Sequence, residues 1–162
     1  MKKGLMRLGE ILVKKGMITE AQLHDALLSQ KLTSGFLGTI LVSKGVIGQR
    51  QLVEALSEQF DLPLIDLKTQ QVDMELSRKF SSSLIVDHKC FPLRSDDMSV
   101  TVAITNPLNA VALSKVEEEA GSKRINWVLA GEEDMKELIQ KYRQNISLNI
   151  QKLLRKDKES QK

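Results

Sequence analysis

The sequence predicts an α+β fold, in which four short helices forming a tandem repeat precede a small mixed α/β domain. Residues 7–30 recur after a five-residue spacer as residues 36–59, with 13 of 24 positions identical, where chance would give about one or two. Beyond Pro63, short β-rich stretches alternate with helical patterns. We therefore predict a helical repeat subdomain at 1–60, an α/β subdomain at 61–146 and a basic C-terminal helix or tail at 147–162.

Each repeat is expected to form two short helices. In the first unit, apolar residues at helical spacing are followed by Gly16, where a left-handed residue would end the helix. Thr19 and Gln22 form the spacing of a capping box, which opens the second helix. The second unit repeats this pattern with Gly45 in place of Gly16. The small and polar residues 31–35 are predicted to be the linker between the units.

The second half is expected to contain four β segments and three helices. In chain order we predict a short strand at 64–67, a helix at 72–80, a hairpin formed by 90–94 and 99–105, a helix from 106 to about 120, a strand at 125–129 and a helix at 132–142. Asp96 and Asp97 lie beside Ser95 in the hairpin loop and are expected to form its turn.

The C-terminal segment continues the helical pattern and places its apolar residues on one side. These residues are Ile146, Ile150, Leu153 and Leu154. Residues 155–162 are rich in lysine and are expected to be frayed and solvated. An amphipathic basic end of this kind suits a membrane surface or a partner helix, and it equally suits an ordinary last helix.

The composition excludes several classes of protein. Hydrophobic residues make up 41% and charged residues 28%, as in globular domains. No apolar run approaches the roughly 20 residues of a membrane span, and the charged start does not form a secretory signal. The single cysteine, Cys90, excludes an internal disulfide and fits a reducing cytoplasm. A net charge of +3 is too small to indicate a nucleic-acid partner.

Enzyme motifs are absent from the sequence. It holds no Gly-x-x-x-x-Gly-Lys-Ser/Thr, Gly-x-Ser-x-Gly, His-Glu-x-x-His or Cys-x-x-Cys pattern. His24 and His88 lack the partners of a nucleophilic site, and two histidines with one cysteine make no metal cluster. We therefore predict a non-enzymatic protein without metal or cofactor.

The repeat itself has the composition of a ligand site. A Leu-Gly pair at a helix start leaves backbone N–H groups for a phosphate, and glycine allows close approach. Leu23 and Leu27 offer an apolar platform for a planar base, and Gln30 can both donate to and accept from a guanine edge. Arg7 can stack on a base or bind an oxygen. Alternatively, the leucines are core residues and the repeat means only that two hairpins pack symmetrically.

The repeat resembles the MshEN domain, the N-terminal cyclic di-GMP-binding module of type II secretion and type IV pilus assembly ATPases. Its first unit reads Arg-Leu-Gly-x-x-Leu-Val-x-x-Gly-x-Ile-x-x-x-x-Leu-x-x-x-Leu-x-x-Gln, and the family signature is two such motifs separated by five residues. The downstream part also looks like the rest of that region. The resemblance implies one half-site formed by Arg7, Leu8, Gly9, Leu23, Leu27 and Gln30. It implies a second formed by Phe36, Leu37, Gly38, Leu52, Leu56 and Gln59. Phe36 stands where the second motif could carry arginine, which implies weaker polar contact on that side.

By this resemblance we expect a cyclic di-GMP-binding receptor domain of bacterial second-messenger signalling, which regulates a type II secretion or type IV pilus system through protein docking. Its expected partners are the assembly ATPase or an inner-membrane platform protein. Its expected location is the cytoplasm, or the periphery of the inner membrane through a partner. The ATPase core is missing from the chain, so a stand-alone regulator and a fragment both stay open. The alternative is a nucleotide-independent adaptor that docks an inner-membrane secretion component or the ATPase.

Overall fold

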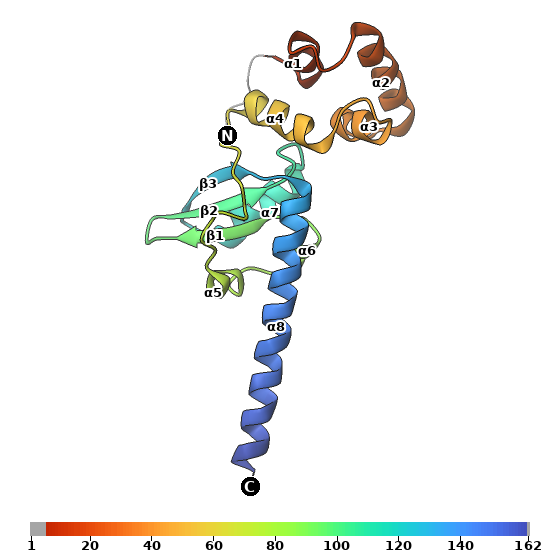
Figure 1. Ribbon diagram of the computed structural model, residues 1–162. Coiled ribbons are helices and arrows are strands. Elements are labelled where there is room, and N and C mark those ends of the chain that lie inside the picture. Colours follow the sequence, from red (N-terminus) through yellow and green to blue (C-terminus); the bar gives the residue numbers. More distant parts are fainter. Residues whose placement is uncertain (1–5, 162) are drawn as a thin grey trace.

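The computed structural model describes residues 6–161 and has the predicted α+β fold. Four helices form an arc at one end of a small sheet, and the last helix leads away from the other end (Figure 1). The helices of the arc are α1 (Leu8–Lys14), α2 (Glu20–Thr33), α3 (Leu37–Ser43) and α4 (Gln49–Phe60). Residues 1–5 and 162, the extremes of the first and last predicted subdomains, lie outside the described residues.

Local sequence signals set the ends of these helices. Gly16 and Gly45 have φ of 70° and 69°, so each repeat has the left-handed residue after its first helix that the sequence predicts. The Thr19 hydroxyl accepts the Gln22 N–H at 3.1 Å, and the Gln22 side-chain oxygen accepts the Thr19 N–H at 2.9 Å. This is the predicted capping box. In the second unit Gly48 replaces the threonine, and only its N–H donation to Gln51 is kept, at 2.9 Å.

The predicted linker at 31–35 is too long. Helix α2 continues through Thr33 and ends where Ser34 adopts a left-handed conformation, with φ of 55°. The Thr33 hydroxyl donates to the Ser29 carbonyl at 2.9 Å, so this polar residue is satisfied inside the helix. Composition alone therefore placed the end of the helix too early.

Three strands form the sheet in the order β1 (Phe91–Ser95), β2 (Ser99–Ile104) and β3 (Arg124–Leu129). The β1–β2 pair is the predicted antiparallel hairpin, and β3 lies parallel to β2 after a crossover through α7 (Ala110–Ala120). Asp96 forms the turn, as predicted. Its carboxylate accepts the N–H groups of Met98 and Ser99 at 2.8 and 2.7 Å, and these bonds lower the pKa of the Asp96 carboxyl.

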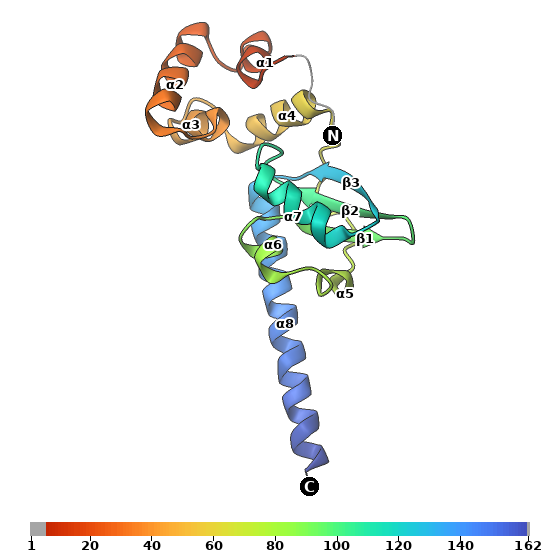
Figure 2. The same cartoon turned by 180° about the vertical axis from the view of Figure 1, so that it is seen from behind.

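Helices cover both faces of the sheet. Figure 2 shows α7 over one face, while α8 (Glu132–Ser160) packs on the other. Successive residues of a strand point to opposite faces, so Val102 joins the core beneath α7 whereas Ala103 joins the core beneath α8. The first of these cores extends through Leu56 of α4 into the repeat. The repeat and the sheet thus share one continuous buried core.

Several elements between the repeat and the sheet differ from the prediction. Only α5 (Met74–Ser77) forms within the predicted helix 72–80. The Asp73 N–H donates to the Leu93 carbonyl at 2.9 Å, so the preceding chain is held extended along the edge of β1. The predicted strand at 64–67 is reduced to one bridge between Leu64 and Leu129. Helix α6 (Ser82–Val86) was not predicted.

The last two helices also have different bounds. Helix α7 begins at Ala110 rather than 106, because the Asn109 side chain accepts the Ala112 N–H and caps it there. Residues 155–160 are exposed, as predicted, but they continue α8 to Ser160 instead of fraying.

The buried thiol of Cys90 makes stability fall at alkaline pH. The side chain is 1% exposed, and burial raises the pKa of the thiol from 9.0 to about 12. The unfolded chain releases this proton above pH 9 while the folded chain retains it, so unfolding becomes more favourable as pH rises toward 12. We expect wild type to lose about 1.4 kcal/mol per pH unit more than Cys90→Ala in this window. Urea unfolding of both proteins at several alkaline pH values measures this difference, and parallel pH profiles would contradict it.

Candidate functional site

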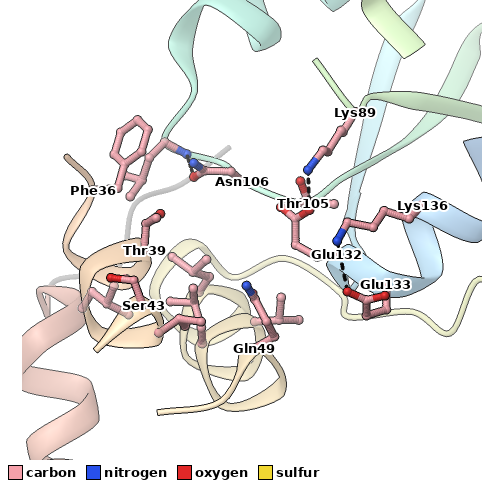
Figure 3. A pocket seen from close by; sticks show the side chains of 17 residues that line it. Phe36, Thr39, Ser43, Gln49, Lys89, Thr105, Asn106, Glu132, Glu133 and Lys136 are labelled. Carbon is pink, nitrogen blue, oxygen red and sulfur yellow. Dashed lines mark hydrogen bonds and ion pairs between the residues drawn. The ribbon is translucent and has the colours of Figure 1, made fainter. Parts of the chain in front are cut away.

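A cavity of about 390 Å³ lies between the repeat and the α/β part. Five of the predicted ligand residues line it, namely Leu8, Phe36, Gly38, Leu52 and Leu56. The opposite wall comes from the loops and helix start of the α/β part, which contribute Lys89, Thr105, Asn106, Leu108, Glu132, Glu133 and Lys136. Figure 3 shows the polar side chains of both walls. The cavity therefore brings the second repeat unit against residues outside the repeat.

The two walls differ in chemistry. Leu52 and Leu56, one turn apart on α4, give the repeat side an apolar surface. On the other side both lysines are already neutralised. Lys89 forms an ion pair with Glu132 at 2.7 Å, and Lys136 forms one with Glu133 at 3.1 Å. An anionic ligand that used these ammonium groups would have to share or displace the carboxylates.

The two motif glycines pack against leucines of their own repeat unit. A Cβ added to Gly9 would lie 2.5 Å from a methyl carbon of Leu23, and one added to Gly38 would lie 2.4 Å from a methyl carbon of Leu52. Both glycines are buried. Close packing of two helices thus accounts for the glycines without a ligand, alongside the close ligand approach expected from the sequence.

Gly38→Ala is therefore expected to lower the free energy of unfolding by about 1–2 kcal/mol, because overpacking outweighs the better helix propensity of alanine. In a double-mutant cycle, Gly38→Ala with Leu52→Ala should cost less than the sum of the single changes, since the clashing methyl groups are gone. Gly35→Ala is the control, because its nearest contact would be an ordinary 3.7 Å. Chemical denaturation measures all four variants. Strict additivity would contradict the packing explanation.

The two glutamines at equivalent positions have different surroundings. The Gln30 amide donates to the Gly35 carbonyl at 2.9 Å in a partly buried position. Gln59 is 5% exposed, and its side-chain oxygen has no hydrogen-bond partner among residues 6–161. The leucines differ in the same way: Leu27 is 40% exposed, whereas Leu56 is 4% exposed. The Leu-Gln face of the second helix is therefore more exposed in the first unit than in the second.

The other predicted residues do not line the cavity. Arg7 is exposed at the start of α1, where its backbone N–H donates to the Glu10 carboxylate at 3.0 Å. Leu37 is partly buried against the core. Phe36 holds the position equivalent to Arg7 and is 45% exposed where the cavity begins. The structure therefore gathers four residues of the second half-site (Phe36, Gly38, Leu52 and Leu56) together with Leu8 at the cavity, and leaves the other seven predicted residues outside.

Sequence reasoning missed the wall formed by Thr105 and Asn106. It treated Asn106 only as the opening of a helix. Asn106 is the second residue after β2, a buried strand that runs parallel to β3. The carboxyl ends of parallel strands commonly carry ligand residues, so a polar residue at this position was a usable signal. The Asn106 side-chain oxygen accepts the Leu108 N–H at 3.0 Å, which fixes the side chain at the cavity wall.

Comparison with known families decides the relationship. A family model described as the MshEN domain matches residues 60–147. This chain belongs to the MshEN domain family. The matched residues follow the repeat, whereas the resemblance noted in the sequence rests on the repeat itself. The assignment thus extends to the α/β part.

Two curated relatives of this MshEN domain are assembly ATPases. Type IV pilus assembly ATPase PilB of Myxococcus xanthus is 31% identical over 136 residues, which is 84% of this chain and 24% of the relative. PilB of Thermus thermophilus is 28% identical over 120 residues, which is 73% of this chain and 14% of the relative. The chain therefore spans a quarter or less of the length of these relatives.

Solved structures share the fold of this MshEN domain. A structure of MshE with cdg has a TM-score of 0.77 and 28% identity, and the likeness covers 85% of this chain and 99% of that chain. A structure of the N-terminal domain of XpsE has a TM-score of 0.64 at 16% identity, covering 86% and 96%. Within residues 6–161, no helix is both long and apolar enough to cross a membrane.

Proposed function

We propose that this MshEN domain is a receptor for cyclic di-GMP, which binds across the two repeat units. The observation that carries the proposal is the likeness to MshE, which was solved with cdg, the abbreviation of cyclic di-GMP. That likeness covers 85% of this chain, a share too large to fit within residues 60–162 alone. It therefore includes part of the repeat.

The repeat supplies chemistry that suits a molecule with two bases and two phosphates. Each unit has two leucines one turn apart, followed by a glutamine one turn further, as in Leu23, Leu27 and Gln30. The leucines offer apolar area to the face of a base, and the amide matches a guanine edge. Arg7 adds an exposed guanidinium for a phosphate or a base. The residues that we propose to contact the ligand are the twelve residues of the two half-sites and, in addition, Asn106.

The proposed regulatory action follows from where the second half-site lies. The cavity is walled by Leu52 and Leu56 of the repeat and by Asn106 and the start of α8. A ligand seated there would contact both parts of the molecule and bias how they present themselves to a partner. We propose that the partner is a type IV pilus or type II secretion assembly ATPase, or an inner-membrane component of such a system.

Calorimetric titration with cyclic di-GMP tests the receptor proposal, with GMP and cyclic di-AMP as controls. We expect saturable, guanine-selective binding with one ligand per chain. We also expect thermal stabilisation, worth about 2.7 kcal/mol at a ligand concentration a hundred times the dissociation constant. Absence of both heat and thermal shift at high micromolar ligand would refute the receptor proposal.

Two single substitutions locate the site. Arg7→Ala and Gln30→Ala should each weaken cyclic di-GMP binding about tenfold or more, because each removes a charge-assisted or amide hydrogen bond to the ligand. Arg50→Ala is the matched control, since the Arg50 side chain is 91% exposed and belongs to neither proposed half-site. Circular dichroism should show unchanged helix content in all three. Equal affinity of Arg7→Ala and Arg50→Ala would remove Arg7 from the site.

A second function is supported by the packing of the motif. Gly9, Gly38 and Gln30 all have partners within the chain, so part of the repeat pattern is explained by folding alone. That observation favours an adaptor that docks the assembly ATPase or an inner-membrane component without a nucleotide. Absence of heat in the cyclic di-GMP titration, combined with binding to such a component without nucleotide, would favour the adaptor function over the receptor function.

A further inference from the structure

Helix α8 extends well beyond the body of the domain. Its 29 residues span about 43 Å, and its last strongly buried residue is Tyr142, at 3% exposed. We call residues 147–160 the α8 overhang; they lead away from the sheet in both views (Figures 1 and 2). An isolated helix of about this length is marginal in water. A partner that covers one face would stabilise it.

The apolar stripe that anchors α8 continues along the overhang. Met135, Ile139 and Tyr142 pack beneath the sheet, and Ile146 packs at the edge of the same core. Ile150 and Leu153 follow at the same helical spacing but are 53% and 62% exposed. The apolar stripe of α8 therefore extends beyond the part of the helix that the sheet covers.

The exposed part of the stripe faces a hollow between α8 and the body of the domain, which we call the corner. This hollow of about 310 Å³ is walled by Ile146, Ile150 and Leu153 on one side. On the other side it is walled by Arg78 and Phe80 of the segment between α5 and α6 and by Ser82 at the start of α6. Because the body lies on the same side of α8 as the stripe, a flat surface cannot lie against both walls. A rod-shaped occupant such as a helix fits this corner better than a bilayer does.

The net charge of the C-terminal segment indicates which kind of protein would bind in the corner. Residues 143–162 carry six basic and two acidic residues, a net +4, although the whole chain carries only +3. At 100° per residue, Lys152 and Lys156 lie on one side of the stripe and Arg143 and Lys158 on the other, and Asp157 ends the apolar stripe beyond Leu153. A second copy of the chain would bring like charges together. An occupant with carboxylates on both flanks would find a cation on each side.

We infer that the α8 overhang docks an acidic amphipathic helix of another protein. The apolar side of that helix would fill the corner between Phe80 and the stripe, and its carboxylates would lie near the flanking lysines. This inference does not depend on cyclic di-GMP binding, since the corner shares no residue with the cavity at the repeat.

A designed peptide tests the charge requirement with the full chain. The probe is a synthetic helix of about three heptads with leucine at the a and d positions and glutamate at e and g. Its counterpart carries lysine at e and g. Fluorescence anisotropy should show binding of the glutamate peptide about tenfold or more tighter than the lysine peptide, and weaker binding at high salt. No binding, or equal binding of both peptides, would overturn the inference.

Variants on opposite sides of α8 test the surface. Leu153→Glu should weaken binding of the glutamate peptide about tenfold or more, because it places a carboxylate in the apolar stripe. Leu148→Glu is the matched control, since Leu148 is 57% exposed but lies on the opposite side of the same helix. Equal losses in both variants would overturn the inference. So would co-sedimentation with phosphatidylglycerol vesicles, or self-association, that Leu153→Glu abolishes.

Discussion

Phe91→Ala is expected to lower the free energy of unfolding by about 3–5 kcal/mol and to destabilise the repeat together with the sheet. Phe91 is completely buried beneath α8, where its ring meets Tyr142 edge to face with centroids 5.9 Å apart. Truncation leaves a large cavity and removes the aromatic contact. Phe36→Ala, at a residue 45% exposed in the repeat, is the control and should cost less than about 1 kcal/mol.

The cooperative part of this expectation follows from the sheet. Strand β2 contributes Ala103 to the core that holds Phe91 and Val102 to the core that reaches the repeat. Urea unfolding can be followed by fluorescence of Trp127, the single tryptophan, which lies in β3. Far-UV circular dichroism follows the helices of both parts. Coincident transitions are expected in wild type and variant, whereas separate transitions would mean that the predicted subdomains at 1–60 and 61–146 fold independently.

Gln59→Leu is expected to stabilise the protein by about 1 kcal/mol and, under the receptor proposal, to weaken cyclic di-GMP binding about tenfold or more. The Gln59 side-chain oxygen is buried without a partner among the described residues, so a leucine of similar shape removes an unsatisfied acceptor. Buried polar groups in native proteins are nearly always hydrogen-bonded, so an unpaired oxygen at this position is available to a ligand. Gln30→Leu should instead lower stability, because the bond to the Gly35 carbonyl is lost.

Denaturation and calorimetry separate the two parts of this prediction. A stability loss above about 1 kcal/mol in Gln59→Leu would show that water or another group satisfies the amide. Unchanged ligand affinity would place Gln59 outside the binding site while leaving the receptor proposal to be judged on Arg7 and Gln30.

The parts of the fold that the sequence predicted correctly are those set by local interactions. Gly16 and the Thr19–Gln22 pair act within one turn of chain, so their pattern predicted the end of α1 and the start of α2. Two of the larger errors, the helix at 72–80 and the strand at 64–67, lie where a distant strand decides the conformation. Asp73 bonds to β1 and Leu64 to β3, and neither partner is visible in the neighbouring sequence.

The candidate site shows the same division. The repeat identified equivalent residues such as Leu27 and Leu56, because identity at fixed spacing can be read directly. It did not predict that one is exposed and the other buried. That asymmetry arises because Leu56 joins the core that the repeat shares with the sheet whereas Leu27 does not, and a symmetric sequence pattern contains no sign of it. Asn106 was missed for the same reason, since its position depends on the arrangement of the sheet.

Helix α8 also has a mechanical consequence. Glu132 and Glu133, in its first turn, form part of the cavity wall at the repeat, and Ser160 lies at the other end of the same unbroken rod. Because the helix is stiff, a tilt of about 5° at its first turn would move its far end by about 4 Å. Under the receptor proposal, an adjustment beside the cavity that tilts α8 on the sheet would therefore become a larger displacement at its tip, where a neighbouring protein would meet it.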